Sequence, residues 1–310
     1  MVTTRIALVR APNPSAMTLS GTNSYLIDCG NGRAVCIDPG PAIDSHVRAL
    51  VQRAADLHCK IALIALTHTH PDHAPAAPML SERTGAPVAA HFKSEFPHTR
   101  DLRDGESLRI GEAALRVVEA PGHTFDHLAF YEERERALFT GDVVLGEGFV
   151  VIAPPNGAMR AYQQTLQRLL REFPGVQTIY GGHGEPVREP QAKLREYIAH
   201  RQAREQEILA ALRGGPMTIP DLVRSIYRET SPVLWPAAAR QMLAHLIALE
   251  QERRIASRAL QRSMTADERA ILNPQWRSIV GEEHARTVEE ELGAMLRLDE
   301  IREYRLRESR

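Results

Sequence analysis

The chain has 310 residues, with 38 basic and 39 acidic side chains, a net charge of -1 and a pI of about 6.9. This balance excludes a strongly basic chain, so any nucleic-acid surface would have to be local. Apolar residues make up 43% and charged residues 25%, which is typical of globular proteins and excludes a disordered chain. No apolar run approaches the roughly 18 residues of a membrane span, and the first residues do not resemble a secretory signal.

The three cysteines indicate a reducing environment. Cys29, Cys36 and Cys59 show no CxxC spacing, and two of them fall in strand-like apolar runs. We interpret them as buried thiols, and the predicted location is the cytoplasm.

The first 190 residues alternate short apolar runs with turns and helical segments. Strands are expected at 5–11, 23–29, 34–40, 60–68 and 177–183, and hairpins at 107–123 and 126–142. Helical spacing of apolar residues predicts helices at 43–57 and 158–173. The sequence therefore favours a strand-rich α/β domain with long functional loops.

The character of the chain changes near residue 190. Helices are expected at 190–213, 218–227 and 236–255, and a short strand at 255–261, which together are typical of a winged-helix unit. We predict domains at 1–190 and 191–262, followed by a charged helical tail at 263–310. Six arginines of the second domain predict either a solvated face or a local nucleic-acid surface: Arg224, Arg228, Arg240, Arg253, Arg254 and Arg258. An apolar stripe in the tail favours packing, including a homodimer contact: Leu292, Met295, Leu296 and Leu298.

The segment LTHTHPDHAPAAPML, residues 66–80, places three histidines and an aspartate directly after a buried strand. Side chains two apart in an extended segment point the same way, so His68 and His70 can converge on one ion. The following turn directs Asp72 and His73 toward a second, adjacent position. Imidazole and carboxylate ligands suit zinc, and also iron or manganese.

Three further strand ends supply the remaining ligands. His123, Asp142 and His183 each follow an apolar run and a glycine, where the backbone can turn sharply. We expect one site of His68, His70 and His123, a second of Asp72, His73 and His183, and Asp142 bridging them: seven ligands and two Zn²⁺ ions, with iron or manganese as alternatives.

These segments, together with NPSAMTLSGTNSYLID, GDVVLGEG and KLREYIAHRQAREQEIL, resemble the metallo-beta-lactamase superfamily, and within it the beta-lactamase-like protein 2 group. The resemblance covers about residues 10–260. It implies a four-layer αββα sandwich, with a binuclear site at one edge, followed by a winged-helix-like domain. The group usually has two glycines after HxHxDH, whereas this chain has Ala74 and Pro75.

The predicted activity is hydrolysis by a hydroxide held between two metal ions, with Asp72 as the catalytic residue that orients the nucleophile. Asp38 is expected to orient a histidine ligand, and His127 and Asn23 to line the site. The substrate would be a small ester, thioester or lactone, or a phosphodiester. Alternatives are a single-stranded RNA endoribonuclease, and a persulfide dioxygenase with one iron on His68, His123 and Asp142. A third is a nucleic-acid-binding protein that acts through the winged helix. No membrane partner is expected.

Overall fold

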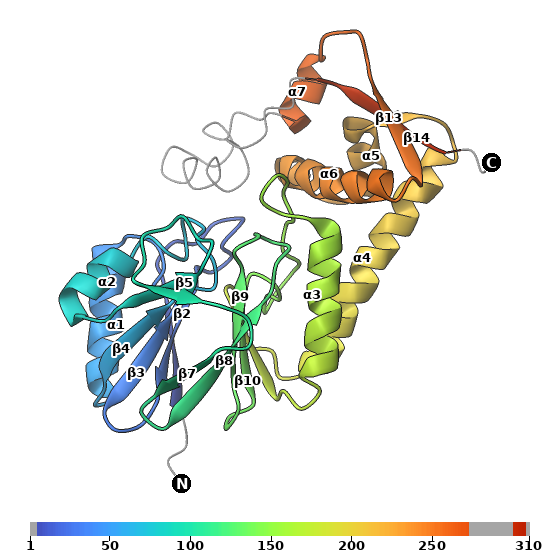
Figure 1. Cartoon of the computed structure of the whole chain (residues 1–310). Coiled ribbons are helices and arrows are strands. Elements are labelled where there is room, and N and C mark those ends of the chain that lie inside the picture. Colours follow the sequence, from blue (N-terminus) through green and yellow to red (C-terminus); the bar gives the residue numbers. More distant parts are fainter. Residues whose placement is uncertain (1–4, 273–299, 308–310) are drawn as a thin grey trace. The chain divides into compact units, whose positions relative to one another are not determined.

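The computed structural model describes residues 5–272 and 300–307, which form two compact units (Figure 1). The first unit comprises residues 1–150 and 165–195, and the second comprises 151–164 and 196–310. The domain boundaries predicted at 190 and 262 stay predictions. Among the described residues, no helix combines the length and apolar content that crossing a membrane requires.

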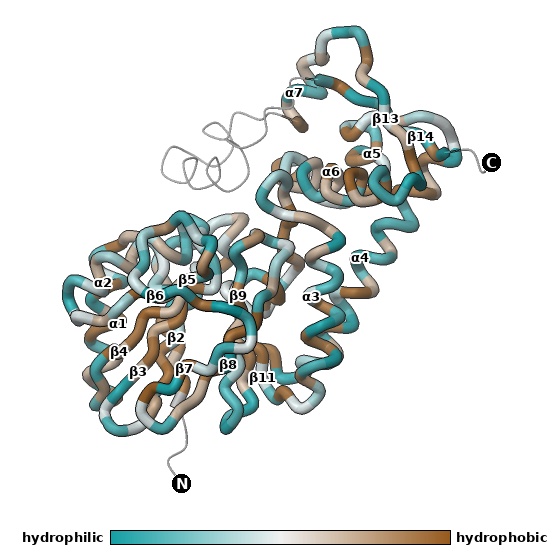
Figure 2. Tube along the Cα trace, in the orientation of Figure 1, coloured by the Kyte–Doolittle hydropathy of each residue, from teal (hydrophilic) through white to brown (hydrophobic). Residues whose placement is uncertain are grey.

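The first unit begins with a six-stranded sheet in the order β1-β2-β3-β4-β5-β6. The strands are β1 (Arg5–Arg10), β2 (Asn23–Asp28), β3 (Arg33–Ile37), β4 (Lys60–Ala65), β5 (Val88–His91) and β6 (Arg100–Leu102). The first three are antiparallel, and β3 through β6 run parallel. Figure 2 shows hydrophobic residues along β3 and β4, as expected for strands that are covered on two faces.

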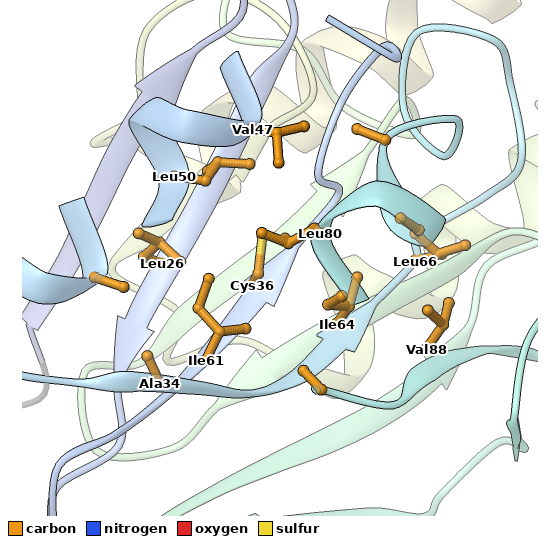
Figure 3. Close-up of a cluster of buried hydrophobic side chains, with 14 of the residues drawn as sticks. Leu26, Ala34, Cys36, Val47, Leu50, Ile61, Ile64, Leu66, Leu80 and Val88 are labelled. Atoms are coloured by element: carbon orange, nitrogen blue, oxygen red, sulfur yellow. The ribbon is translucent and has the colours of Figure 1, made fainter. Parts of the chain in front are cut away.

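Helices α1 (Asp44–Asp56) and α2 (Ala77–Thr84) cover one face of this sheet. Successive strand residues point to opposite faces, so Leu26 and Cys36 pack under the helices with Leu50 of α1 and Leu80 of α2 (Figure 3). Their sequence neighbours, such as Ile27, enter a different core on the other face.

That other core lies between the first sheet and a five-stranded sheet in the order β11-β10-β9-β8-β7. Its strands are β7 (Ser107–Ile110), β8 (Ala113–Glu119), β9 (Leu128–Glu132), β10 (Ala137–Gly141) and β11 (Thr178–Gly181). On the outer face, the last turns of α3 (Met159–Glu172) lie against β8, where Arg168 donates to the carbonyl of Glu119 at 3.0 Å. The predicted αββα sandwich is confirmed, as are its two hairpins.

The second unit has the helices and the wing of a winged-helix domain. It contains most of α4 (Pro190–Leu212), then α5 (Ile219–Ile226), η1 (Pro232–Leu234), α6 (Trp235–Gln251) and α7 (Ala266–Leu272). A capping box between Thr218 and Asp221 starts α5. The unit's sheet has the order β12 (Met217–Thr218), β14 (Arg302–Leu306) and β13 (Ile255–Ala259). The predicted winged-helix-like domain is thus confirmed.

The tail differs in part from its prediction. Residues Ala266–Leu272 form helix α7, as expected for a helical tail. Arg302–Leu306 instead forms strand β14, because it pairs with β13 along its whole length. The apolar stripe proposed as a packing or dimer element, 292–298, lies outside the described residues. Arg240, in α6, is buried, so it belongs neither to the predicted solvated face nor to a nucleic-acid surface.

Candidate metal centre

The predicted ligands meet because their strands run in the same direction. Strands β3 and β4 are parallel neighbours, as are β10 and β11, and β8 runs the same way as β10. Their carboxyl ends therefore reach one edge of the sandwich. The chain leaves these ends through five segments that carry the candidate residues: Asp38, His68–His73, His123, Asp142 and His183.

The first donor group consists of His68, His70 and His123, whose candidate ligand atoms all lie within 4.8 Å of one another. His123 Nε2 is 3.0 Å from His70 Nδ1. Burial, reinforced by the neighbouring His123, lowers the pKa of His70 to about 3. Burial likewise lowers the pKa of His68 well below its usual value. Neutral imidazoles keep a lone pair for a metal ion, so this group is prepared to bind a cation.

The second donor group consists of Asp72, His73 and His183, all buried. His73 Nε2 and His183 Nε2 are each 3.3 Å from Asp72 Oδ2. Burial opposes a charge on His183, but the carboxylates of Asp142 and Asp72 outweigh it and raise its pKa to about 10. The same balance raises the pKa of His73 well above its usual value. The carboxylates thus favour the protonated forms of His73 and His183, and a bound metal ion would replace these protons.

Asp142 lies between the two groups. Its Oδ1 is 3.4 Å from His73 Nε2, and its Oδ2 is 3.5 Å from His183 Nε2 and 3.8 Å from His123 Nε2. One carboxylate therefore reaches histidines of the first and the second group. This is the position that the sequence predicts for a bridging ligand.

Several buried polar atoms of these residues have no hydrogen-bond partner. They are His68 Nε2, His73 Nε2 and Asp142 Oδ1. Buried polar atoms usually have a partner, so three such atoms in one cluster suit the binding of a metal ion. The neighbouring Gly182 leaves room for them, because a Cβ there would lie 2.2 Å from Asp142 Oδ1. Imidazole and carboxylate donors of this kind fit a pair of divalent metal ions.

Asp38 orients histidines of both groups, directly and through Thr67. Its Oδ2 accepts from His73 Nδ1 at 2.8 Å and from the Thr67 hydroxyl at 2.6 Å. Since that hydroxyl donates to Asp38, it accepts from His68 Nδ1, which lies 3.0 Å away. Nε2 is then the free nitrogen of each ring. Asp38 also lies near enough to group with His68 and His73 as a ligand, but its oxygens already accept these hydrogen bonds.

The sequence analysis missed Thr67, although a hydroxyl residue directly before HxH is visible in the sequence. It also missed Thr22, whose hydroxyl donates to Asp72 Oδ2 at 2.7 Å. His183 is oriented by a backbone group, because its Nδ1 lies 3.3 Å from the carbonyl of Gly21. These partners come from distant parts of the chain, so spacing in the sequence does not reveal them.

His127 and Asn23 lie next to the centre but beneath it. His127 is fully buried and stacks on His68 with ring centroids 4.6 Å apart, while its Nε2 accepts from the backbone N–H of Asp142. The Asn23 amide donates to the carbonyls of Gly181 and Gly184 and so holds the segment that carries His183. The structure gives both residues positioning contacts, and their roles at the substrate stay predictions.

Comparison with known proteins agrees with this architecture. Residues 17–183 match the model of the metallo-beta-lactamase superfamily, and residues 218–262 match the beta-lactamase associated winged helix domain. The chain is 35% identical to a beta-lactamase-like protein 2 homolog of Drosophila melanogaster, over 81% of this chain and 89% of that protein. It is 32% identical to an atrochrysone carboxyl ACP thioesterase of Aspergillus chevalieri, over 73% of this chain and 74% of the other.

Among solved structures, a metallo-beta-lactamase family protein of Thermus thermophilus matches with a TM-score of 0.68 and 26% identity, over 82% of this chain and 95% of that one. The sandwich and its edge of histidines and aspartates fit a metal-dependent hydrolase. The chain belongs to the metallo-beta-lactamase superfamily and carries the winged helix domain associated with it.

Proposed function

We propose that the protein hydrolyses acyl thioesters with a pair of divalent metal ions, zinc being the first candidate. The observation that carries this proposal is the position of Asp142, within 3.8 Å of His123 and 3.5 Å of His183. His68, His70 and His123 would hold one ion, Asp72, His73 and His183 the other, and Asp142 both. When bound, the ions supply a water of lowered pKa and polarise the acyl carbonyl.

The residues of the chain then perform separate tasks. Asp38 and Thr67 keep the Nε2 atoms of His68 and His73 directed at the centre. Thr22 fixes the orientation of Asp72, the residue that we assign to orienting the attacking water. In the reaction, the acyl carbon forms a bond to the water oxygen, the carbon–sulfur bond breaks, and the thiol leaves with a proton.

Thioesters come first among the candidate substrates because a relative at 32% identity is named as a carboxyl ACP thioesterase. Esters and lactones react at the same kind of carbonyl carbon and come next. Single-stranded RNA is the first alternative from another class. None of the three cysteines forms a disulfide, which supports a reducing compartment such as the cytoplasm.

The test combines metal analysis with activity in wild type, Asp142→Ala and the control Asp56→Ala, which removes an exposed carboxylate of α1. We expect about two zinc ions per wild-type chain and hydrolysis of an acetyl or hexanoyl thioester. Asp142→Ala should lose activity at least about a hundredfold and bind less metal, while Asp56→Ala behaves like wild type.

Other results would redirect the assignment. A single iron per chain and oxidation of a persulfide would replace the proposal with the dioxygenase alternative. Cleavage of single-stranded RNA without thioester hydrolysis would replace it with the endoribonuclease. Metal content that is unchanged by Asp142→Ala would contradict the proposed role of that residue.

A further inference from the structure

Phe125 is an exposed aromatic residue in the loop between His123 and His127. Its exposed fraction is 56%, the highest of the four large apolar side chains that are exposed among the described residues. The other three, Val233, Leu234 and Ile247, belong to the second unit. Single exposed apolar residues are common, so the position of Phe125 rather than its exposure alone carries the argument.

The loop that carries Phe125 is fixed to the candidate metal centre. Asp126, the next residue, accepts the hydroxyl of Thr69 at 2.9 Å, and Thr69 lies between His68 and His70 in the sequence. A backbone hydrogen bond from Gly122 to Thr124 tightens the turn before Phe125. The loop that carries Phe125 is therefore joined to the His68–His70 segment through its next residue, Asp126.

Solvent reaches part of the first donor group. His70 is partly exposed, whereas Asp72, His73 and His183 are buried. The loop at 121–127 contains His123, which belongs to the same donor group as His70. The only charged side chain of this loop is the carboxylate of Asp126, and the loop has no lysine or arginine. The loop thus offers an aromatic ring and a negative charge, which favour an uncharged apolar group over a phosphate backbone.

We infer that Phe125 is a specificity-determining residue that contacts the apolar part of the acyl group, so that preferred substrates carry a medium-length aliphatic or an aromatic acyl chain. This inference rests on the proposed thioesterase function. Full burial of a phenylalanine side chain stabilises by about 1.5–3 kcal/mol, and 56% of Phe125 is exposed. Covering that part with substrate therefore has an expected effect of about fourfold to twentyfold on relative kcat/KM.

The test measures kcat/KM for acetyl, hexanoyl and benzoyl thioesters of N-acetylcysteamine in wild type, Phe125→Ala, Phe125→Leu and the control Ile247→Ala. We expect Phe125→Ala to lower the hexanoyl-to-acetyl and benzoyl-to-acetyl ratios about fourfold or more and to leave metal content unchanged. Phe125→Leu should retain most of the hexanoyl preference, and Ile247→Ala should match wild type. Calorimetric binding of an S-hexyl thioether, which cannot be hydrolysed, should weaken in Phe125→Ala alone.

Unchanged ratios in Phe125→Ala, with acetyl thioester still hydrolysed, would overturn the inference and leave the proposed function intact. If wild type hydrolyses none of the thioesters, the proposed function fails and this inference fails with it. If Phe125→Ala instead impairs cleavage of single-stranded RNA, the ring stacks on a base and the acyl assignment is wrong.

Discussion

The carboxylate of Asp38 accepts two hydrogen bonds from Thr67, from the backbone N–H at 2.7 Å and from the hydroxyl at 2.6 Å. The threonine is thereby locked at the end of β4, in the position where its hydroxyl also meets His68 Nδ1. The buried Asp38 thus decides, through Thr67, which nitrogen of His68 is free.

Removing the Thr67 hydroxyl should weaken metal binding. Thr67→Val keeps the side-chain shape, but it leaves His68 Nδ1 without an acceptor and takes a donor from Asp38. We expect metal affinity to fall about 10–100-fold, the usual effect of losing an orienting partner. Competition with a zinc chelator measures it. Thr67→Ser should restore wild-type affinity, and Thr84→Val in α2 is the control for a hydrogen-bonded hydroxyl lost elsewhere. Equal affinities in Thr67→Val and wild type would contradict the proposed positioning role.

A methyl group at position 182 should disrupt the centre. In Gly182→Ala the new Cβ would lie 2.2 Å from Asp142 Oδ1 and 2.6 Å from His73 Cε1, closer than real contacts allow. Asp142 must move, so metal content and thioesterase activity should fall at least about tenfold. Gly175→Ala is the matched control, because its Cβ would meet nothing within 4 Å. Full metal loading of Gly182→Ala would show that Asp142 is not held where the structure has it.

His46 should make the first unit less stable in acid. Its ring is buried against Ser24 Oγ at 2.9 Å, and burial lowers its pKa to about 4 from 6.5. Between pH 4 and pH 6.5, the unfolded chain therefore binds a proton at His46 that the folded chain does not bind. The contribution of His46 to the free energy of unfolding is fully present above pH 6.5. It decreases as the pH falls toward 4, and about 2 kcal/mol of it is lost by pH 5.

The measurement is urea unfolding of metal-free protein at pH 7.5 and pH 5. His46→Gln removes the titrating group, so its stability should fall less between the two pH values than that of wild type. The exposed His58 provides the control substitution, His58→Gln. An identical pH dependence in wild type and His46→Gln would mean that His46 is not the group responsible.

Glu205 should be the most sensitive carboxylate of the second unit. It is buried and accepts from Arg160 at 2.6 Å and, by a further short contact, from Arg254. Glu205→Ala leaves two cations without this partner, and because both arginines are partly exposed we expect a loss of about 2 kcal/mol of unfolding free energy. The control is Glu207, an exposed carboxylate that pairs with Arg204, and Glu207→Ala should cost under about 1 kcal/mol. Amide hydrogen exchange in α4 and α6 should be faster in Glu205→Ala than in Glu207→Ala. Equal protection of these helices in the two variants would contradict the prediction.

The structure brings the predicted donor residues together at one edge, and the sequence indicated this because each of them follows a run that is mostly apolar. His123 and His183 could be placed at one edge without knowing any pairing, since strand, glycine and histidine recur together. Thr67 and Asp38 are 29 positions apart, so their contact depends on the pairing of β3 with β4 and not on local pattern.

Other elements lack a local signal altogether. Strand β6 has three residues, Arg100–Leu102, two of which are charged, and it forms because β5 offers a parallel edge. Strand β14 is similarly charged, and its sequence REYRL favours a helix as much as a strand. Its conformation is fixed by β13, whose Ser257 lies opposite Tyr304. Tertiary pairing, rather than propensity, decided these elements.

The contacts of Asp38 also bear on how the protein acquires its metal. One carboxylate restrains His73 directly and His68 through Thr67, so the ordering of one ring contributes to the ordering of the other. In the proposed two-metal centre, a first ion that orders one ring would also order the other, and a second ion would enter a centre that is already arranged. Under limiting metal, such a protein would divide into empty and doubly loaded chains, with few singly loaded ones. Its activity would then rise steeply, rather than in proportion, as metal becomes available.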